Sequence, residues 1–169
     1  MRQCALPYME DLAVKIGQSC YLCMLYQSQT MVIVQARSHS PIFLNITEGS
    51  LFPTRTSTSG KMLLANSNDA VRDMLLEHDA EFSAFNAQQR KDVLSELVEI
   101  KNSGILQQHN ALINGVTDVA VLVGEPEGQV IASLAVSSLN SHLGKPLDQA
   151  SLLTQLSATA KIITRQLGC

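Results

Sequence analysis

The spacing of apolar residues along this chain changes from helical to strand-like and back, twice. The predicted helices are 2–16, a segment from about 59 to 66, a segment capped by Asn68, a segment between Asn86 and Gly104, and 147–167. The predicted strands are 19–27, 30–37, 41–47, 104–108, 115–123 and 129–138. The order of helix, strands, helices, strands and helix predicts an α/β (α+β) fold in which helices flank a central antiparallel sheet.

The composition is that of a single globular domain. The chain has 169 residues, of which 46% are hydrophobic, so we expect residues 1–169 to form one domain with its own core. No apolar run reaches the roughly 20 residues of a membrane span, and the N-terminus lacks the apolar region of a secretion signal, so we expect a cytoplasmic location and no membrane partner. The net charge of −3 and the dispersed Lys and Arg residues argue against direct binding of nucleic acid.

Two cysteines have a spacing found in metal and redox sites, Cys20-x-x-Cys23. They lie in a predicted strand, where side chains three residues apart point to opposite faces of the sheet. The two sulfur atoms could not easily share one ligand, so we expect buried free thiols. The four histidines are scattered through predicted loops and helix ends, and we expect neither a metal site nor a cofactor.

A run of hydroxyl residues, 56–59, precedes the apolar segment that starts after Lys61. Such residues cap helices, and the free N–H groups of a first helical turn favour anions and polar oxygens. The run therefore predicts either a helix cap or the wall of a ligand site. A nucleotide-phosphate loop is excluded, because it would need glycine at Arg55 and a hydroxyl at Met62.

Asp118 lies on a predicted strand, on the face that it shares with Ala120, and it can meet the face of Ser133 and Ser137 on the next strand. A carboxylate on a half-buried strand needs partners, so we expect Asp118 at an exposed edge, in a structural hydrogen bond, or on a ligand. No histidine or second carboxylate is evident on this wall. Nucleophilic hydrolysis is therefore not predicted, and the chain is not expected to be an enzyme.

Several motifs occur together in the order and spacing of one family. Residues 49–65 have the pattern Gly-x-x-x-Pro, six residues, then Gly-Lys-x-x-Leu-Ala, and the segments 6–13, 97–104, 115–123 and 132–138 follow the same family pattern. In these motifs the chain resembles the C-terminal effector-binding domain of the isocitrate lyase regulator (IclR) family of bacterial transcription regulators. The resemblance covers nearly the whole chain.

The resemblance implies a GAF-like fold with a cup beside the sheet for a small-molecule metabolite effector. It also implies a homodimer or homotetramer that contacts DNA only through an N-terminal winged helix-turn-helix domain, which this sequence lacks. Binding of the effector would change the DNA affinity of that domain. The alternative reading is a stand-alone GAF-like redox enzyme that uses Cys20 or Cys23.

Carried over by position, the ligand wall of the family falls on the helix start in the hydroxyl run and on the three predicted strands 104–108, 115–123 and 129–138. The residues so implied are Ser57, Thr58, Gln108, Asp118, Ala135 and Ser137. The family often has cysteine where this chain has Asp118. Because an ionised Asp118 would repel a carboxylate, we expect an effector with hydroxyl or amine donors that face Asp118.

Overall fold

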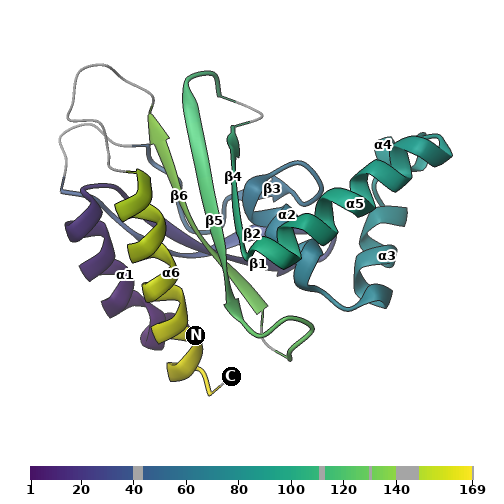
Figure 1. Ribbon diagram of the computed structural model, residues 1–169. Helices are drawn as coiled ribbons and strands as arrows, with labels where there is room; N and C mark the ends of the chain where they lie inside the picture. The colour runs from purple at the N-terminus through teal and green to yellow at the C-terminus, as the bar shows by residue number, and fades with distance from the viewer. Residues whose placement is uncertain (40–43, 111–112, 130, 140–148, 169) are drawn as a thin grey trace.

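One six-stranded antiparallel sheet organises the fold in the computed structural model (Figure 1), which describes residues 1–39, 44–110, 113–129, 131–139 and 149–168. The helices are α1 (Arg2–Ile16), α2 (Thr58–Asn66), α3 (Asp69–Glu77), α4 (Ala80–Ser83), α5 (Ala87–Ser103) and α6 (Gln149–Gln166). The strands are β1 (Cys20–Tyr26), β2 (Gln29–Ala36), β3 (Leu51–Pro53), β4 (Ile105–His109), β5 (Val116–Gly124) and β6 (Ile131–Leu139). Their spatial order is β3-β2-β1-β6-β5-β4, which confirms the predicted fold class.

Helices cover both faces of the sheet (Figure 1). The helices α1 and α6 lie side by side over one face, and α2 and α5 lie on the other. Alternate residues of each strand enter the two cores, because successive side chains of a strand point to opposite faces. Val119 and Leu134 belong to the α1–α6 core, whereas their chain neighbours Ala120 and Ala135 belong to the α2–α5 core. The strand faces expected from the alternation are thus confirmed.

The helix ends follow local sequence signals. Asn86 forms a capping box at the start of α5, in which its side chain accepts a hydrogen bond from the Gln89 N–H group and the Gln89 side chain accepts one from the Asn86 N–H group. The α5 helix ends at Gly104, whose φ of 69° lies in the left-handed region that glycine adopts without strain. Asn68 caps α3 as predicted. Among the described helices, none is both long and apolar enough to cross a bilayer.

The third strand of the meander differs from the prediction. The expected strand 41–47 begins outside the described residues, and its described part, 44–47, is not a strand. The strand that pairs with β2 is instead β3, which lies inside the segment that the sequence predicted to be a loop. A turn at Gly49, whose N–H group donates to the Val32 carbonyl, brings Leu51–Pro53 alongside β2. Pro53 is tolerated there because β3 is an edge strand.

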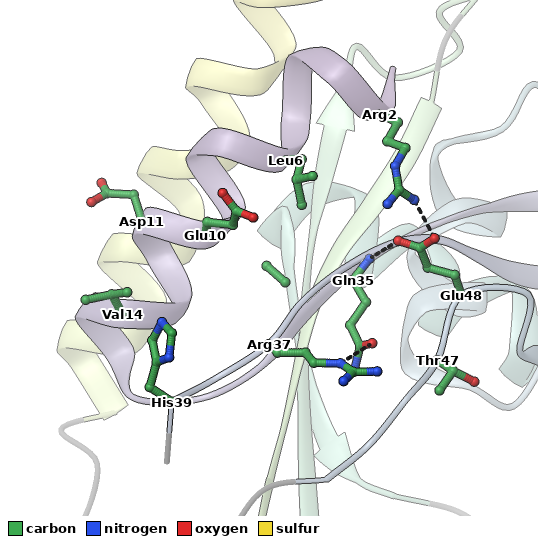
Figure 2. A pocket seen from close by; sticks show the side chains of 11 residues that line it. Arg2, Leu6, Glu10, Asp11, Val14, Gln35, Arg37, His39, Thr47 and Glu48 are labelled. Carbon is green, nitrogen blue, oxygen red and sulfur yellow. Dashed lines mark hydrogen bonds and ion pairs between the residues drawn. The ribbon is translucent and has the colours of Figure 1, made fainter.

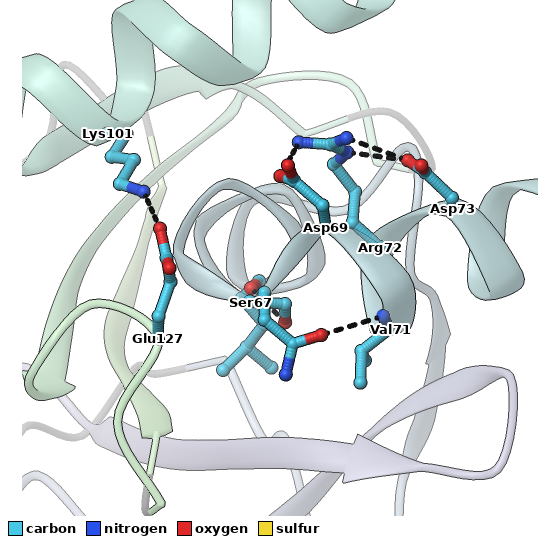
Figure 3. Close-up of polar contacts among 9 residues, drawn as sticks. Ser67, Asp69, Val71, Arg72, Asp73, Lys101 and Glu127 are labelled. Carbon is cyan, nitrogen blue, oxygen red and sulfur yellow. Dashed lines mark hydrogen bonds and ion pairs between the residues drawn. The ribbon is translucent and has the colours of Figure 1, made fainter.

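The C-terminal end of α2 is tied to the β5–β6 turn (Figure 3). The Glu127 N–H group donates to the carbonyl of Asn66, the last residue of α2, at 2.7 Å. The Glu127 carboxylate lies 2.5 Å from Nζ of Lys101 on α5, and Arg72 of α3 pairs with Asp69 and Asp73 nearby. These ion pairs are partly exposed and contribute little energy each. The backbone bond from Glu127 is the contact that ties the turn to the far end of α2, and the Lys101–Glu127 pair ties the same turn to α5.

Candidate functional site

The start of α2 is capped and buried. Ser57 is the N-cap, and its Oγ accepts a hydrogen bond of 3.2 Å from the Gly60 N–H group. The next two residues, Thr58 and Ser59, are only 2% and 3% exposed. The capping interpretation of the hydroxyl run is therefore confirmed. The first N–H groups of a helix have no acceptor within the helix, so this end also offers donors and a positive dipole to its surroundings.

Asp118 lies directly in front of this helix start. It is 5% exposed and belongs to β5, which is flanked by β4 and β6, so the exposed-edge alternative is wrong. Its Oδ1 accepts a hydrogen bond of 2.6 Å from Ser137, its register partner on β6. Its Oδ2 accepts bonds from Asn110 at 2.7 Å and from Thr58 at 3.3 Å. The structural role of Asp118 is thereby established.

The directions of these hydrogen bonds can be assigned. The Ile113 N–H group donates to Oδ1 of Asn110, which leaves the Asn110 Nδ2 group to face Asp118. Ser137 gives its single proton to Asp118, so the Tyr21 hydroxyl must donate to Ser137 across their 2.8 Å contact. Burial raises the pKa of Tyr21 well above its ordinary value, and the charge of Asp118 adds to that effect. Tyr21 is therefore a proton donor throughout the physiological range.

A pocket lies between the start of α2 and Asp118. Its walls are the segment 56–59, Tyr21, Asn110 and Asp118, and on the other side Ile46, Phe52 and Pro53. The pocket has an empty volume of ≈ 420 Å³ when the part open to solvent is counted. The volume that the centre of a water molecule can occupy is only ≈ 30 Å³. That space holds about two water molecules. A metabolite therefore needs the walls to move apart.

The six residues implied by the resemblance do not all reach this pocket. Ser57, Thr58 and Asp118 line it, and Ser137 supports Asp118. Ala135 is fully buried beside Ala120 in the α2–α5 core, and Gln108 lines a separate cavity between α2, α5 and β4. The Gln108 Nε2 group donates to the Thr56 carbonyl at 3.1 Å, so this residue holds the segment that precedes α2.

Two polar residues of the pocket, Tyr21 and Asn110, are not among the predicted site residues. Tyr21 reads only as a strand residue, and Asn110 follows the end of β4. Neither has a local signal of function, since both act through contacts with residues distant in the sequence. The pairing of β1 with β6 brings Tyr21 to Ala135, two positions before Ser137 on the neighbouring strand.

A larger hollow than the Asp118 pocket lies elsewhere, between α1 and the end of β2 (Figure 2). It has a volume of ≈ 850 Å³ and is lined by charged side chains, among them Arg2, Glu10, Arg37 and Glu48. Arg2 pairs with Glu48, and the Gln35 N–H group donates to the same carboxylate. The trough is open and contains none of the predicted site residues. A small-molecule site is usually enclosed and largely apolar, which favours the Asp118 pocket.

The two strand cysteines lie on opposite faces of the sheet, as expected. Cys20 belongs to the α1–α6 core and Cys23 to the α2–α5 core. Burial raises the pKa of each thiol to about 12, so neither is a thiolate near neutral pH. Within the described residues there is also no group of three His, Cys, Asp or Glu side chains that could hold a metal ion.

The chain is similar to known transcriptional regulators. The family described as bacterial transcriptional regulator IclR, C-terminal, matches residues 1–165. The HTH-type transcriptional regulator XynR of Escherichia coli K12 is 26% identical over an alignment 170 residues long that covers 99% of this chain and 67% of XynR. The chain spans from about half to two thirds of the length of the curated relatives that it matches.

Solved structures of regulators have the same fold. A transcriptional regulator from Rhodococcus sp. RHA1 superposes with a TM-score of 0.82 at 21% identity, over 99% of this chain and 69% of that one. An IclR homologue from Microbacterium hydrocarbonoxydans, crystallised with 4-hydroxybenzoate, has a TM-score of 0.78 at 20% identity, over 98% of this chain and 67% of that one. With the family match over nearly all of its length, this chain belongs to the IclR family of bacterial transcriptional regulators and corresponds to the C-terminal domain of that family.

Proposed function

We propose that this domain senses a small-molecule effector in the pocket between Asp118 and the start of α2. The observation that carries the proposal is the buried Asp118 carboxylate, held by neutral donors beside a helix N-terminus that walls the same pocket. The complex of the Microbacterium homologue with 4-hydroxybenzoate supports binding of a small organic effector by this fold. Ser57, Thr58 and Asp118 are the proposed contact residues, and Ser137 supports Asp118 from behind. Gln108 acts indirectly, by holding the Thr56 carbonyl, and Ala135 packs in the core behind the pocket.

Effector entry requires movement of the outer wall. Phe52 and Pro53 belong to β3, which pairs with β2 through only three residues, and Ile46 lies in a segment without regular structure. This wall has the fewest sheet hydrogen bonds around the pocket, so it opens at the lowest cost. An effector that binds only the open arrangement shifts the population towards it. Through this population shift, effector binding would be transmitted to the rest of a regulator.

The remaining properties follow from the role of a sensor domain. We propose that the domain acts as a homodimer or homotetramer in the cytoplasm and has no catalytic activity. Its net charge of −3 is consistent with DNA binding by a separate winged helix-turn-helix domain. The longer relatives named as HTH-type regulators support that arrangement.

Blocking the pocket tests the proposal. Thr56→Trp adds a bulky side chain at a residue that lines this pocket and the neighbouring Gln108 cavity, and it keeps the N-cap residue Ser57. Ser95→Trp on the exposed surface of α5 is its matched control. A metabolite panel is screened by thermal unfolding against both variants and the unaltered protein. A ligand at 100 times its Kd stabilises by about 2.7 kcal/mol, which raises the Tm by roughly 5–10 °C.

We expect at least one compound to stabilise the unaltered protein and Ser95→Trp but not Thr56→Trp. Stabilisation that persists in Thr56→Trp would place the ligand outside this pocket. A panel that stabilises none of the three proteins would also contradict the proposed function.

Alkylation with iodoacetamide at pH 8 separates a sensor from a cysteine-dependent enzyme. A thiol with a pKa of about 12 is about one ten-thousandth ionised at that pH. We therefore expect Cys20 and Cys23 to react at least roughly 100-fold more slowly than the exposed Cys4, as peptide mapping would show. In guanidinium chloride the three rates should converge. Rapid alkylation of Cys20 or Cys23 in the folded protein would instead favour the enzyme.

A further inference from the structure

Asp118 is a buried carboxylate with no cationic partner among the described residues. The ion pairs of the described chain involve other acidic residues, and the groups that bond to Asp118 are the neutral side chains of Thr58, Asn110 and Ser137. A carboxylate has about four acceptor sites, and these bonds occupy three. The bond from Thr58, at 3.3 Å, is also the longest of them. The pocket thus contains an anionic acceptor with capacity for a further donor.

A second polar group in the same pocket lacks a partner. Ser59 lines the pocket and is 3% exposed, yet its Oγ has no hydrogen-bond partner in the described structure. Its neighbour is the thiol of Cys23, whose pKa is raised by burial and lowered in part by the Ser59 hydroxyl. The contact between the Ser59 hydroxyl and the Cys23 thiol, itself a weak donor, does not have the geometry of a hydrogen bond. A buried hydroxyl without a partner is unfavourable, and a ligand atom that bonds to it recovers the lost hydrogen bond.

The two groups offer different chemistry at two positions of one small pocket. Asp118 accepts hydrogen bonds and attracts positive charge, whereas the Ser59 hydroxyl and the N–H groups at the start of α2 can donate to an acceptor. A carboxylate next to Asp118 would meet a like charge in a partly dry site, which costs several kcal/mol. The pocket therefore distinguishes ligands by the group that they direct at Asp118.

We propose that the effector directs an amine or hydroxyl donor at Asp118 and an acceptor at Ser59 and the start of α2. This inference rests on the proposed function and specifies the chemical class of its ligand. An acid can bind only if its carboxylate points to α2 and a separate donor faces Asp118. Asp118 is then the residue that sets effector specificity.

A matched set of small probes tests this inference with the 169-residue chain. The set carries an amine, an alcohol or a carboxylate on a propyl or a benzyl skeleton: propylamine, 1-propanol, propionate, benzylamine, benzyl alcohol and benzoate. Binding is measured by chemical-shift titration of the unaltered protein, of Asp118→Asn, and of Glu99→Gln, which removes an exposed carboxylate on α5. Shifts at Thr58 and Ser59 locate the probe in the pocket.

We expect the amine of each skeleton to bind the unaltered protein at least about tenfold more tightly than the acid. Asp118→Asn should weaken amine binding by about tenfold or more and alcohol binding by less, because Asn still offers an acceptor. Glu99→Gln should change neither. The ranking of amine over acid tests the inference even where Asp118→Asn does not fold.

Acids that bind in the pocket as tightly as the amines, and equally in Asp118→Asn, would overturn this inference and leave the proposed function standing. The inference would also be overturned, with the proposed function left standing, by a metabolite that has no N–H or O–H donor and that stabilises the unaltered protein but not Thr56→Trp. Failure of every probe and every panel compound to perturb Thr58 and Ser59 would overturn the proposed function, and the inference with it.

Discussion

Replacing Gly60 with alanine is expected to destabilise the domain by about 3 kcal/mol or more. A Cβ at this position would lie 2.1 Å from the Thr54 carbonyl oxygen and 2.6 Å from the Thr54 Cα atom. These are backbone atoms, and Thr54 is itself held, since its Oγ1 donates to the Ser28 carbonyl at 3.0 Å. The helix and the preceding segment would have to separate. Urea denaturation followed by circular dichroism measures the loss.

Gly17→Ala is the matched control for this substitution. Gly17 has a φ of 67° at the end of α1, but nothing lies within 4 Å of a Cβ placed there. Its cost is therefore that of the left-handed backbone alone, about 1–2 kcal/mol. A Gly60→Ala variant as stable as Gly17→Ala would contradict the close packing of α2 on Thr54. Because the lining segment 56–59 lies between Thr54 and Gly60, separating these two residues would displace it, so Gly60→Ala should weaken effector binding.

Leu134→Ala is expected to cost about 2–5 kcal/mol. Leu134 lies in β6, at the middle of the sheet, and its side chain is fully buried in the α1–α6 core. Truncation to alanine removes apolar contact area and leaves a cavity that strands paired on both sides cannot close. Thermal and urea unfolding should show the loss with the β-sheet signal retained under native conditions.

A leucine in the same strand provides the control. Leu139 ends β6 and is 42% exposed, so Leu139→Ala should cost less than about 1 kcal/mol. Equal losses from the two substitutions would mean that the α1–α6 core is not packed around Leu134. Unlike Gly60→Ala, Leu134→Ala acts on the sheet face away from the pocket, so probe binding by its folded fraction should be unchanged.

Part of the candidate site could be read from local sequence. A hydroxyl residue before an apolar helical run predicts an N-cap, and Ser57 has that role. The turn between β5 and β6 sets the pairing of the two strands, and strand alternation places Asp118 and Ser137 on one face, where they are register partners. These inferences needed only contacts between chain neighbours or between strands joined by a short turn.

Other parts of the site depend on packing between distant elements. The predicted position of the third strand was wrong. Residues that can form a strand occur both in 41–47 and in 51–53, and only the turn at Gly49 and the open edge of β2 select 51–53. The contacts of Asp118 with Thr58, 60 positions earlier in the chain, and of Tyr21 with Ser137 arise when α2 and β1 pack beside β5 and β6. No local pattern encodes those distances.

Periodicity and capping residues predicted most of the helices and strands and the two faces of the sheet, because each depends on interactions of near neighbours. The family followed from the resemblance in motifs such as residues 49–65, and the family match confirms it. The size of the pocket, the partners of Asp118 and the separation of Gln108 from it arise only when the chain is folded. They depend on how closely buried side chains from distant segments fill the same space, a property that a linear pattern does not contain.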